Sequence, residues 1–187
     1  MVPFMVSLHA RARAILLAAW LLAAASGCGY TQKSLLSENI KSIHVAPVKN
    51  EIDLSSEIND KSHFRVYRPG VEVDITNAII NQFIFDGHLK VVSLEKANAV
   101  VEAKLVDYRR DPLRYSNNED IQEYRLSVLV DVTVTQTADH KILWHENLVG
   151  ETTFFLSGSR AVSEDEAAAK AVEDLARRVV EKTIELW

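Results

Sequence analysis

The sequence predicts an α+β fold, a two-layer sandwich of two helices packed on one face of a mainly antiparallel sheet with four to five strands. Long alternation of apolar and polar residues, clearest in EYRLSVLVDVTVTQ (Glu123–Gln136), is typical of strands that bury one face. Two other segments, which begin near Pro69 and Ser163, carry apolar residues at helical spacing on one side only. The order of these segments along the chain is β-α-β-β-β-β-α.

The first strand and the first helix come early in the chain. SIHVAPV (Ser42–Val48) predicts a short strand that ends near its proline, and the polar residues 49–63 predict a long loop. In RPGVEVDITNAIINQFIFDGH, Pro69 and Gly70 precede a helix, and Gly87 is a candidate C-cap. The predicted buried stripe of this helix is Ile75, Ile79, Ile80, Phe83 and Ile84.

Four strands follow the first helix. LKVVS (Leu89–Ser93) predicts a short strand, and AVVEAKLVDYRR (Ala99–Arg110) alternates with Val101, Ala103 and Leu105 on one side. A tight turn at Thr137–Lys141 separates the last two strands, at 121–136 and 141–155. The strand 121–136 should bury Tyr124, Leu126, Val128, Val130, Val132 and Val134. Its opposite side, expected to be wet, holds Arg125, Ser127, Asp131, Thr133 and Thr135. The strand 141–155 has Ile142, Trp144 and Leu148 in phase.

The second helix covers SEDEAAAKAVEDLARRVVEKTIELW at the end of the sequence. Ser163 stands three residues before Glu166, which predicts a capping box, and acidic residues in the first turn favour the positive end of the helix dipole. The predicted buried stripe is Ala168, Val172, Leu175, Val179 and Leu186. The predicted solvent-facing residues are Arg177, Arg178, Glu181 and Lys182.

The N-terminal residues 1–27 have the features of a secretory signal peptide. Arg11 and Arg13 precede an uncharged run, AILLAAWLLAAA (Ala14–Ala25), which is shorter than the roughly 20 residues that span a bilayer. The run Ala25-Ser26-Gly27-Cys28 resembles a bacterial lipobox, in which the thiol receives a diacylglyceryl group and the new amine is acylated. We therefore predict a lipoprotein signal peptide at 1–27, a lipidated tether at 28–41 and one α+β domain at 42–187.

Cys28 is the chain's single cysteine. A transmembrane anchor, or plain secretion with a free thiol, is the alternative to lipid attachment. An unpaired exposed thiol is a liability in an oxidising compartment, so a blocked thiol is the better interpretation. Because no aspartate follows Cys28, nothing signals retention in an inner membrane. The expected location is the periplasmic side of the outer membrane.

The composition favours one acidic domain. Residues 1–27 carry two of the 21 basic and none of the 26 acidic residues, so their removal leaves a chain of 160 residues with a net charge of −7. This charge argues against nucleic acid as a partner.

No catalytic or metal-binding constellation is present in the sequence. The five histidines that remain after residue 27 form no HxH or HExxH pair, and His140 and His145 are best interpreted as a chance pairing. The acids Asp107, Asp111, Glu119 and Asp120 are typical of solvated loops. We predict a protein that is not an enzyme and that uses no metal or cofactor.

Several blocks of the sequence together resemble the LptE family of lipopolysaccharide-assembly lipoproteins. They occur in the order expected for the family and cover nearly all of the chain after residue 27. The blocks are GCGY (Gly27–Tyr30), IHVAPVKN (Ile43–Asn50), EVDITNAIINQF (Glu72–Phe83), ANAVVEAKLVDY (Ala97–Tyr108), EYRLSVLVDV (Glu123–Val132) and ILWHENLVGETTF (Ile142–Phe154).

The resemblance implies a lipoprotein that binds lipopolysaccharide and plugs a large outer-membrane β-barrel translocon. Such a protein assists assembly of the barrel and delivery of lipopolysaccharide to the outer leaflet, and makes or breaks no bond. Its partners would be that barrel, lipopolysaccharide and the membrane that holds its lipid anchor.

The predicted topology offers candidate contacts for an anionic lipid headgroup. If the last three strands form a meander, the loops 111–120 and 156–162 meet at one end, and the loop 49–68 should open there too. Arginines form bidentate pairs with phosphate oxygens. We predict that Arg114 and Arg160, supported by Arg110 and Arg65, receive the headgroup. The simpler alternative is solvated loop charge that balances the acids of those loops.

Two other function classes stay open. One is a different outer-membrane lipoprotein with a similar small domain, such as an activator of a cell-wall synthase or a secretion-pore subunit. The other is an enzyme, which the missing catalytic constellation disfavours.

Overall fold

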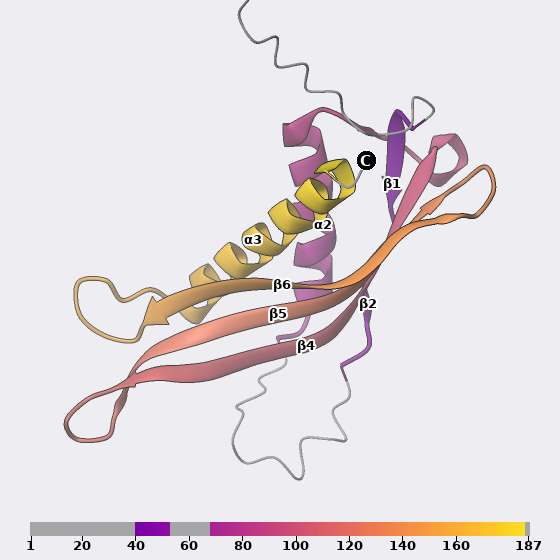
Figure 1. The fold of residues 1–187 in the computed structure, drawn as a ribbon. Helices are drawn as coiled ribbons and strands as arrows, with labels where there is room; N and C mark the ends of the chain where they lie inside the picture. Colours follow the sequence, from indigo (N-terminus) through magenta and orange to yellow (C-terminus); the bar gives the residue numbers. More distant parts are fainter. Residues whose placement is uncertain (1–39, 53–67, 186–187) are drawn as a thin grey trace, which may run out of the picture. The chain divides into compact units, whose positions relative to one another are not determined.

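The computed structural model describes residues 40–52 and 68–185 (Figure 1). The elements, in chain order, are β1 Ser42–Val45, β2 Lys49–Asn50, α2 Val71–Asp86, β3 Lys90–Val91, the 3₁₀-helix η2 Leu94–Lys96, β4 Ala99–Tyr115, β5 Ile121–Gln136, β6 Ile142–Phe155 and α3 Glu164–Glu185. Both α-helices lie on the same face of the sheet, and their buried residues form one hydrophobic core with that face. The predicted α+β fold is confirmed.

The sheet is mixed, and it is more parallel than predicted. Its strand order is β3-β1-β4-β5-β6, with β2 also paired to β4. β4, β5 and β6 form the expected antiparallel meander, but β1 runs parallel to both β3 and β4. The reason is the connection through α2, because a crossover helix returns the chain to the sheet in the same direction. The predicted first strand ends at Val45, just before Pro47, which lacks an N–H; β2 lies in the segment 49–63 that was predicted as a loop, which corrects the start of that loop.

The meander buries the residues that alternation predicted. In β5, every residue from Tyr124 to Val134 in the predicted buried set is at most 8% exposed. In β6, Trp144 is buried and Leu148 is partly buried, but Ile142 is 59% exposed. A register shift between Val134 and Thr135 puts Ile142 out of phase, so the prediction for Ile142 is wrong.

The two helices begin and end as the sequence indicates. α2 lies between Gly70 and Gly87, both with positive φ, and the Gly87 N–H donates to the Phe83 carbonyl at 3.1 Å. Its buried face is Val71, Ile75, Ile79 and Phe83. Ile84 is 63% exposed, which corrects its predicted place in the buried stripe.

Helix α3 is capped as predicted at its first turn. Ser163 Oγ accepts the Glu166 N–H at 3.1 Å, whereas the Glu166 carboxylate pairs with Lys170 instead of completing the capping box. The predicted residues Ala168, Val172, Leu175 and Val179 are buried. The predicted Leu186 lies outside the described residues.

Gly150 allows α3 to approach β6 closely. A Cβ atom on Gly150 would lie 2.2 Å from the Ala171 carbonyl oxygen and 2.5 Å from Leu175 Cβ. The facing side of α3 carries small residues, Ala167, Ala168, Ala171 and Ala176, all buried. A glycine in the strand and alanines on the helix therefore set the spacing between the two layers.

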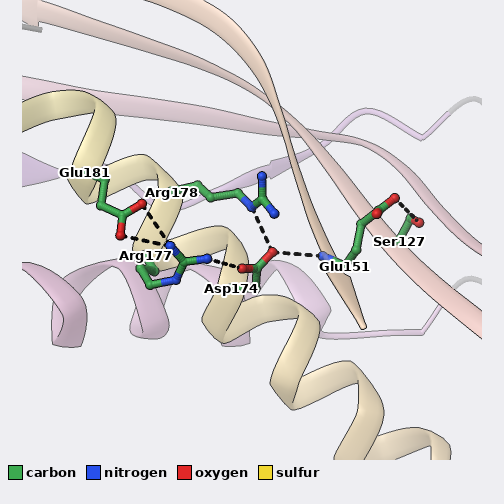
Figure 2. Close-up of polar contacts among 6 residues, drawn as sticks. All are labelled: Ser127, Glu151, Asp174, Arg177, Arg178 and Glu181. Atoms are coloured by element: carbon green, nitrogen blue, oxygen red, sulfur yellow. Dashed lines mark hydrogen bonds and ion pairs between the residues drawn. The ribbon is translucent and has the colours of Figure 1, made fainter. Parts of the chain in front are cut away.

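Asp174 joins α3 to the outer strand of the sheet (Figure 2). Its carboxylate accepts the Glu151 N–H at 3.2 Å and the Arg178 Nε–H at 2.8 Å, and it also pairs with Arg177. Partial burial acts to raise the pKa of Asp174, but the hydrogen bonds from Arg178, Glu151 and Arg177 outweigh it and hold the pKa below its ordinary value. The ionised carboxylate is thus the form that the fold stabilises.

Replacing Asp174 with asparagine should lower the free energy of unfolding by about 2 kcal/mol at pH 7. A carboxyl whose pKa is lowered by folding stabilises the folded state above its unfolded pKa of 3.8, and this contribution is lost as the pH falls through the folded value. Urea unfolding of both proteins from pH 7 to pH 3 checks this. If the difference in free energy of unfolding between the two proteins stayed constant from pH 7 to pH 3, the lowered pKa of Asp174 would be contradicted.

Candidate functional site

β4 contains bulges, and one of them sets the face of the sheet on which Arg114 lies. A first register shift follows Leu105, and a second falls between Pro112 and Arg114. Pro112 pairs with Tyr124 on the helix side of the sheet, whereas Arg114 pairs with Glu123 on the opposite side. Arg114 Nε lies 3.5 Å from Glu123 Oε2, and its side chain is 58% exposed.

Phe155 continues the same row across the sheet. Glu123 is in register with Phe155, and their neighbours Tyr124 and Phe154 stack in the core with ring centroids 5.8 Å apart. Since adjacent strand residues face opposite sides, Phe155 lies on the face away from the helices, together with Glu123 and Arg114. The Arg114 guanidinium carbon is 5.7 Å from the centroid of the Phe155 ring.

The loop after β6 brings Arg160 to the same ring. Gly158 has φ +88°, and the Ala161 N–H donates to the Gly158 carbonyl at 3.2 Å, so the chain reverses there. The Val162 N–H then donates to the Phe155 carbonyl at 3.3 Å. This return places the Arg160 guanidinium carbon 4.7 Å from the Phe155 centroid. We call Arg114, Phe155 and Arg160 the arginine–phenylalanine site.

The site has the chemistry of an anion receptor with an apolar surround. Two guanidinium groups share one ring, each cation–π contact contributes about 0.5–1 kcal/mol at an exposed position, and only Arg114 has a nearby carboxylate. Within residues 40–52 and 68–185, Arg160 forms no ion pair. Three large apolar residues next to these positions in the chain are exposed: Leu113 at 42%, Tyr115 at 56% and Leu156 at 49%. An anionic amphiphile matches this combination.

Arg110 lies on the other face of the sheet. Its guanidinium carbon is 4.7 Å above the Tyr124 ring, and it pairs with Glu164 in the first turn of α3. The structure therefore does not bring Arg110 together with Arg114 and Arg160. Arg65 lies outside the described residues, so its predicted role stays a prediction.

The other basic groups near this end balance acids, as the simpler alternative expects. Arg109 Nη1 lies 3.4 Å from Asp107 Oδ2, and Arg109 Nε lies 3.3 Å from Asp111 Oδ2. Arg68 pairs with Asp74 and Asp165. Tyr108 is buried beside the Arg110–Glu164 pair. Burial, and next the Glu164 charge, raise the pKa of Tyr108 to about 12, so its hydroxyl stays protonated. The Arg110–Glu164 pair joins β4 to the start of α3, and Arg68 joins the starts of the two helices.

Sequence reasoning missed Phe155. The signal was present, because Phe154 and Phe155 are consecutive aromatic residues at the end of a strand, and alternation allows only one of them to enter the core. Arg125 also stands on this outer face, in register with Asp111 and Thr153. The sequence placed Arg125 on the wet face but gave it no role.

Neither metal ligands nor membrane spans are found in the described segments. No group of three or more His, Cys, Asp or Glu side chains there could hold a metal ion. His145, the candidate partner of His140, instead pairs with Asp131 of the neighbouring strand at 2.8 Å. Among the same residues, no helix has the length and apolar character needed to cross a bilayer.

The fold and the arginine–phenylalanine site together define a two-layer α+β domain suited to binding. Residues 40–183 match the family model described as LptE, lipopolysaccharide-assembly. Because this match covers most of the sequence, the chain belongs to that family, as its resemblance predicted. Comparison with curated proteins gives no match.

Two solved structures show the same fold. One is a protein from Xanthomonas campestris, with a TM-score of 0.55 and 10% identity, covering 78% of this chain and 85% of the other. The second is a protein from Chlamydia trachomatis described as hypothetical, with a TM-score of 0.54 and 15% identity, covering 79% of this chain and 97% of the other. At these identities the likeness concerns the fold alone.

Proposed function

We propose that this protein is an outer-membrane lipoprotein that captures lipopolysaccharide and assists its delivery to the outer leaflet through a β-barrel translocon that it plugs. Membership of the lipopolysaccharide-assembly family supports the general role. The observation that carries the finer proposal is the meeting of Arg114 and Arg160 on the Phe155 ring. Acyl chains on Cys28 would hold the protein at the periplasmic side of the membrane.

The proposed ligand fits the arginine–phenylalanine site in charge and in apolar character. Lipid A carries phosphates, and a guanidinium group can offer two parallel N–H donors to phosphate oxygens. Phe155 restricts both guanidinium groups, so less freedom is lost when an anion binds. The exposed side chains of Leu113, Tyr115 and Leu156 could contact the acyl chains of the same molecule.

The shape of the meander is consistent with a plug. β4 has 17 residues and extends roughly 50 Å from Ala99 to the hairpin that follows Tyr115. β1, near the start of the described chain, pairs with the opposite end of β4 through Ile43 and Ala99. A domain tethered by its N-terminal end could therefore reach into a barrel with its loops.

Reversing both charges, with Arg114→Glu and Arg160→Glu, should weaken capture of lipopolysaccharide by about 10- to 100-fold. Each charge-assisted hydrogen bond contributes about 1.5–3 kcal/mol, and part of this is already opposed by Glu123. Binding of purified protein to immobilised lipopolysaccharide measures the effect.

A matched control makes the same change in charge elsewhere. Lys49→Glu and Lys141→Glu alter exposed positions outside the site that form no ion pair within the described residues, and far-ultraviolet circular dichroism verifies the fold of both double variants. Equal binding by the two double variants would refute the arginine–phenylalanine site as the lipopolysaccharide receptor.

A further inference from the structure

Helix α2 has an exposed apolar end that the core does not use. Residues 75–85 of α2 contain no charged side chain. Ile84 is 63% exposed and Phe85 is 86% exposed. By contrast, the residues that α3 exposes to solvent are mostly polar or charged. A helix that is apolar on more than its core-facing side typically contacts a second apolar phase or partner.

This end of α2 lies where the described chain begins. After the Gly87 cap, the Lys90 N–H donates to the Lys41 carbonyl at 3.1 Å, and Lys90 is in register with Ser42. Figure 1 shows the end of α2 and the start of β1 at the top of the view, away from the hairpin that joins β4 to β5. The segment that enters the domain at Ile40 therefore joins it at the exposed end of α2.

The next turn of the chain adds a third apolar side chain and a set of lysines. Leu94, in η2, is 54% exposed, and the Lys96 carbonyl accepts the Ser42 hydroxyl at 3.1 Å, which keeps η2 beside β1. We define the proximal patch by its apolar members and the lysines around them. They are Ile84, Phe85, Leu94, Lys41, Lys90 and Lys96.

The charges around the proximal patch suit a phosphate-bearing surface. Lys41, Lys90 and Lys96 are exposed, and within the described residues none of them forms an ion pair. Of the nearby acids, Asp86 Oδ2 lies 2.8 Å from His88 Nδ1, Glu95 is exposed, and Glu173 of α3 lines the same hollow as Phe85. Lysines can lay their apolar stems beside buried side chains while the ammonium groups reach headgroup phosphates.

Covalent reach decides which end of the domain stays near the anchor. Ile40 lies twelve positions after Cys28, so the two Cα atoms can be at most about 40 Å apart. The far hairpin lies roughly 50 Å along β4 from the pairing of Ile43 with Ala99. A lipid on Cys28 therefore keeps the proximal patch within reach of the bilayer more readily than the arginine–phenylalanine site.

We infer that the proximal patch is a second membrane contact, whose apolar side chains enter the interfacial layer of the bilayer that holds the Cys28 lipid. The occupant is a lipid surface with anionic headgroups. This contact holds the end of the domain that carries Ile43 and Ala99 at the bilayer surface, and leaves the long hairpin at the opposite end of β4 free to enter the barrel. The inference rests on the lipid anchor of the proposed function.

Fluorescence from labelled cysteines tests this contact directly. Because Cys28 is the only cysteine and would be acylated, Phe85→Cys, Leu94→Cys and the control Asn117→Cys can each be labelled with the dye NBD. The acylated full chain is reconstituted into vesicles of three parts phosphatidylethanolamine to one part phosphatidylglycerol. We expect blue-shifted emission at positions 85 and 94 and loss of that emission with spin-labelled lipid, but neither change at position 117.

The possible outcomes separate the anchor from the patch. Chains that float with the vesicles but give aqueous emission at positions 85 and 94 would overturn the inference and leave the anchor in place. Chains that do not float would overturn both. Shielding of position 85 that requires a higher protein concentration or an added barrel protein would show a protein contact instead, and would also overturn the inference.

Discussion

Replacing Gly150 with alanine is expected to lower the free energy of unfolding by about 3 kcal/mol or more. The added Cβ would meet the Ala171 carbonyl oxygen at 2.2 Å and the Leu175 backbone nitrogen at 2.8 Å. Both atoms belong to the backbone of α3, so no rotamer change can relieve the overlap. The helix must move away from β6, and the core between them then loses its packing.

Thermal and urea unfolding of the Gly150→Ala variant give the measurement. The control is Thr153→Val on the same strand, an exposed position at which the free energy of unfolding should change by less than about 0.5 kcal/mol. Equal stability of the two variants would show that α3 is not held against β6 as described.

Replacing Cys28 with serine should abolish stable attachment to the membrane. Burial of each CH₂ group of an acyl chain contributes about 0.8 kcal/mol, and one chain alone anchors only marginally, so loss of all the acyl chains removes the anchor. The chain has no second cysteine that could replace Cys28.

Membrane fractionation and incorporation of radiolabelled palmitate check this prediction. Ser26→Ala, which keeps a small residue before the cleavage site, is the matched control and should remain labelled and sedimented with membranes. Incorporation of palmitate by the serine variant, or none by the natural sequence, would contradict lipid attachment at Cys28.

The regular elements were predictable because local pattern and tertiary burial agree in them. The alternation of β5 from Tyr124 to Val134 survives in the structure because both of its neighbours are long strands and the extra residue of the bulge opposite Leu129 and Val130 lies on β4. The limits of α2 follow from Gly70 and Gly87, whose positive φ values favour glycine.

The bulges were not predictable from alternation. In β4 the phase changes after Leu105, so that Tyr108 and Arg110 turn toward the helices, and changes again before Arg114. Such shifts are decided by packing against the neighbouring strand, which a single sequence does not encode locally. They separate Arg110 from Arg114, although the two residues are only four positions apart in the sequence.

The parallel part of the sheet has a similar explanation. Short strands such as β1 and β3 carry too few residues to indicate a partner, and their pairing follows from where α2 returns the chain. Arg114 and Arg160 were found for a different reason. The ends of adjacent antiparallel strands must meet, so the loops that follow β4 and β6 could be placed together before their contacts with Phe155 were known.

Purification of the full chain from detergent-solubilised membranes, through a tag placed after residue 187, tests the central claim most directly. The account predicts that one large outer-membrane β-barrel protein is recovered in equal amount, together with lipopolysaccharide. Recovery of the chain alone, with a periplasmic enzyme, or as a ring of its own copies would contradict it.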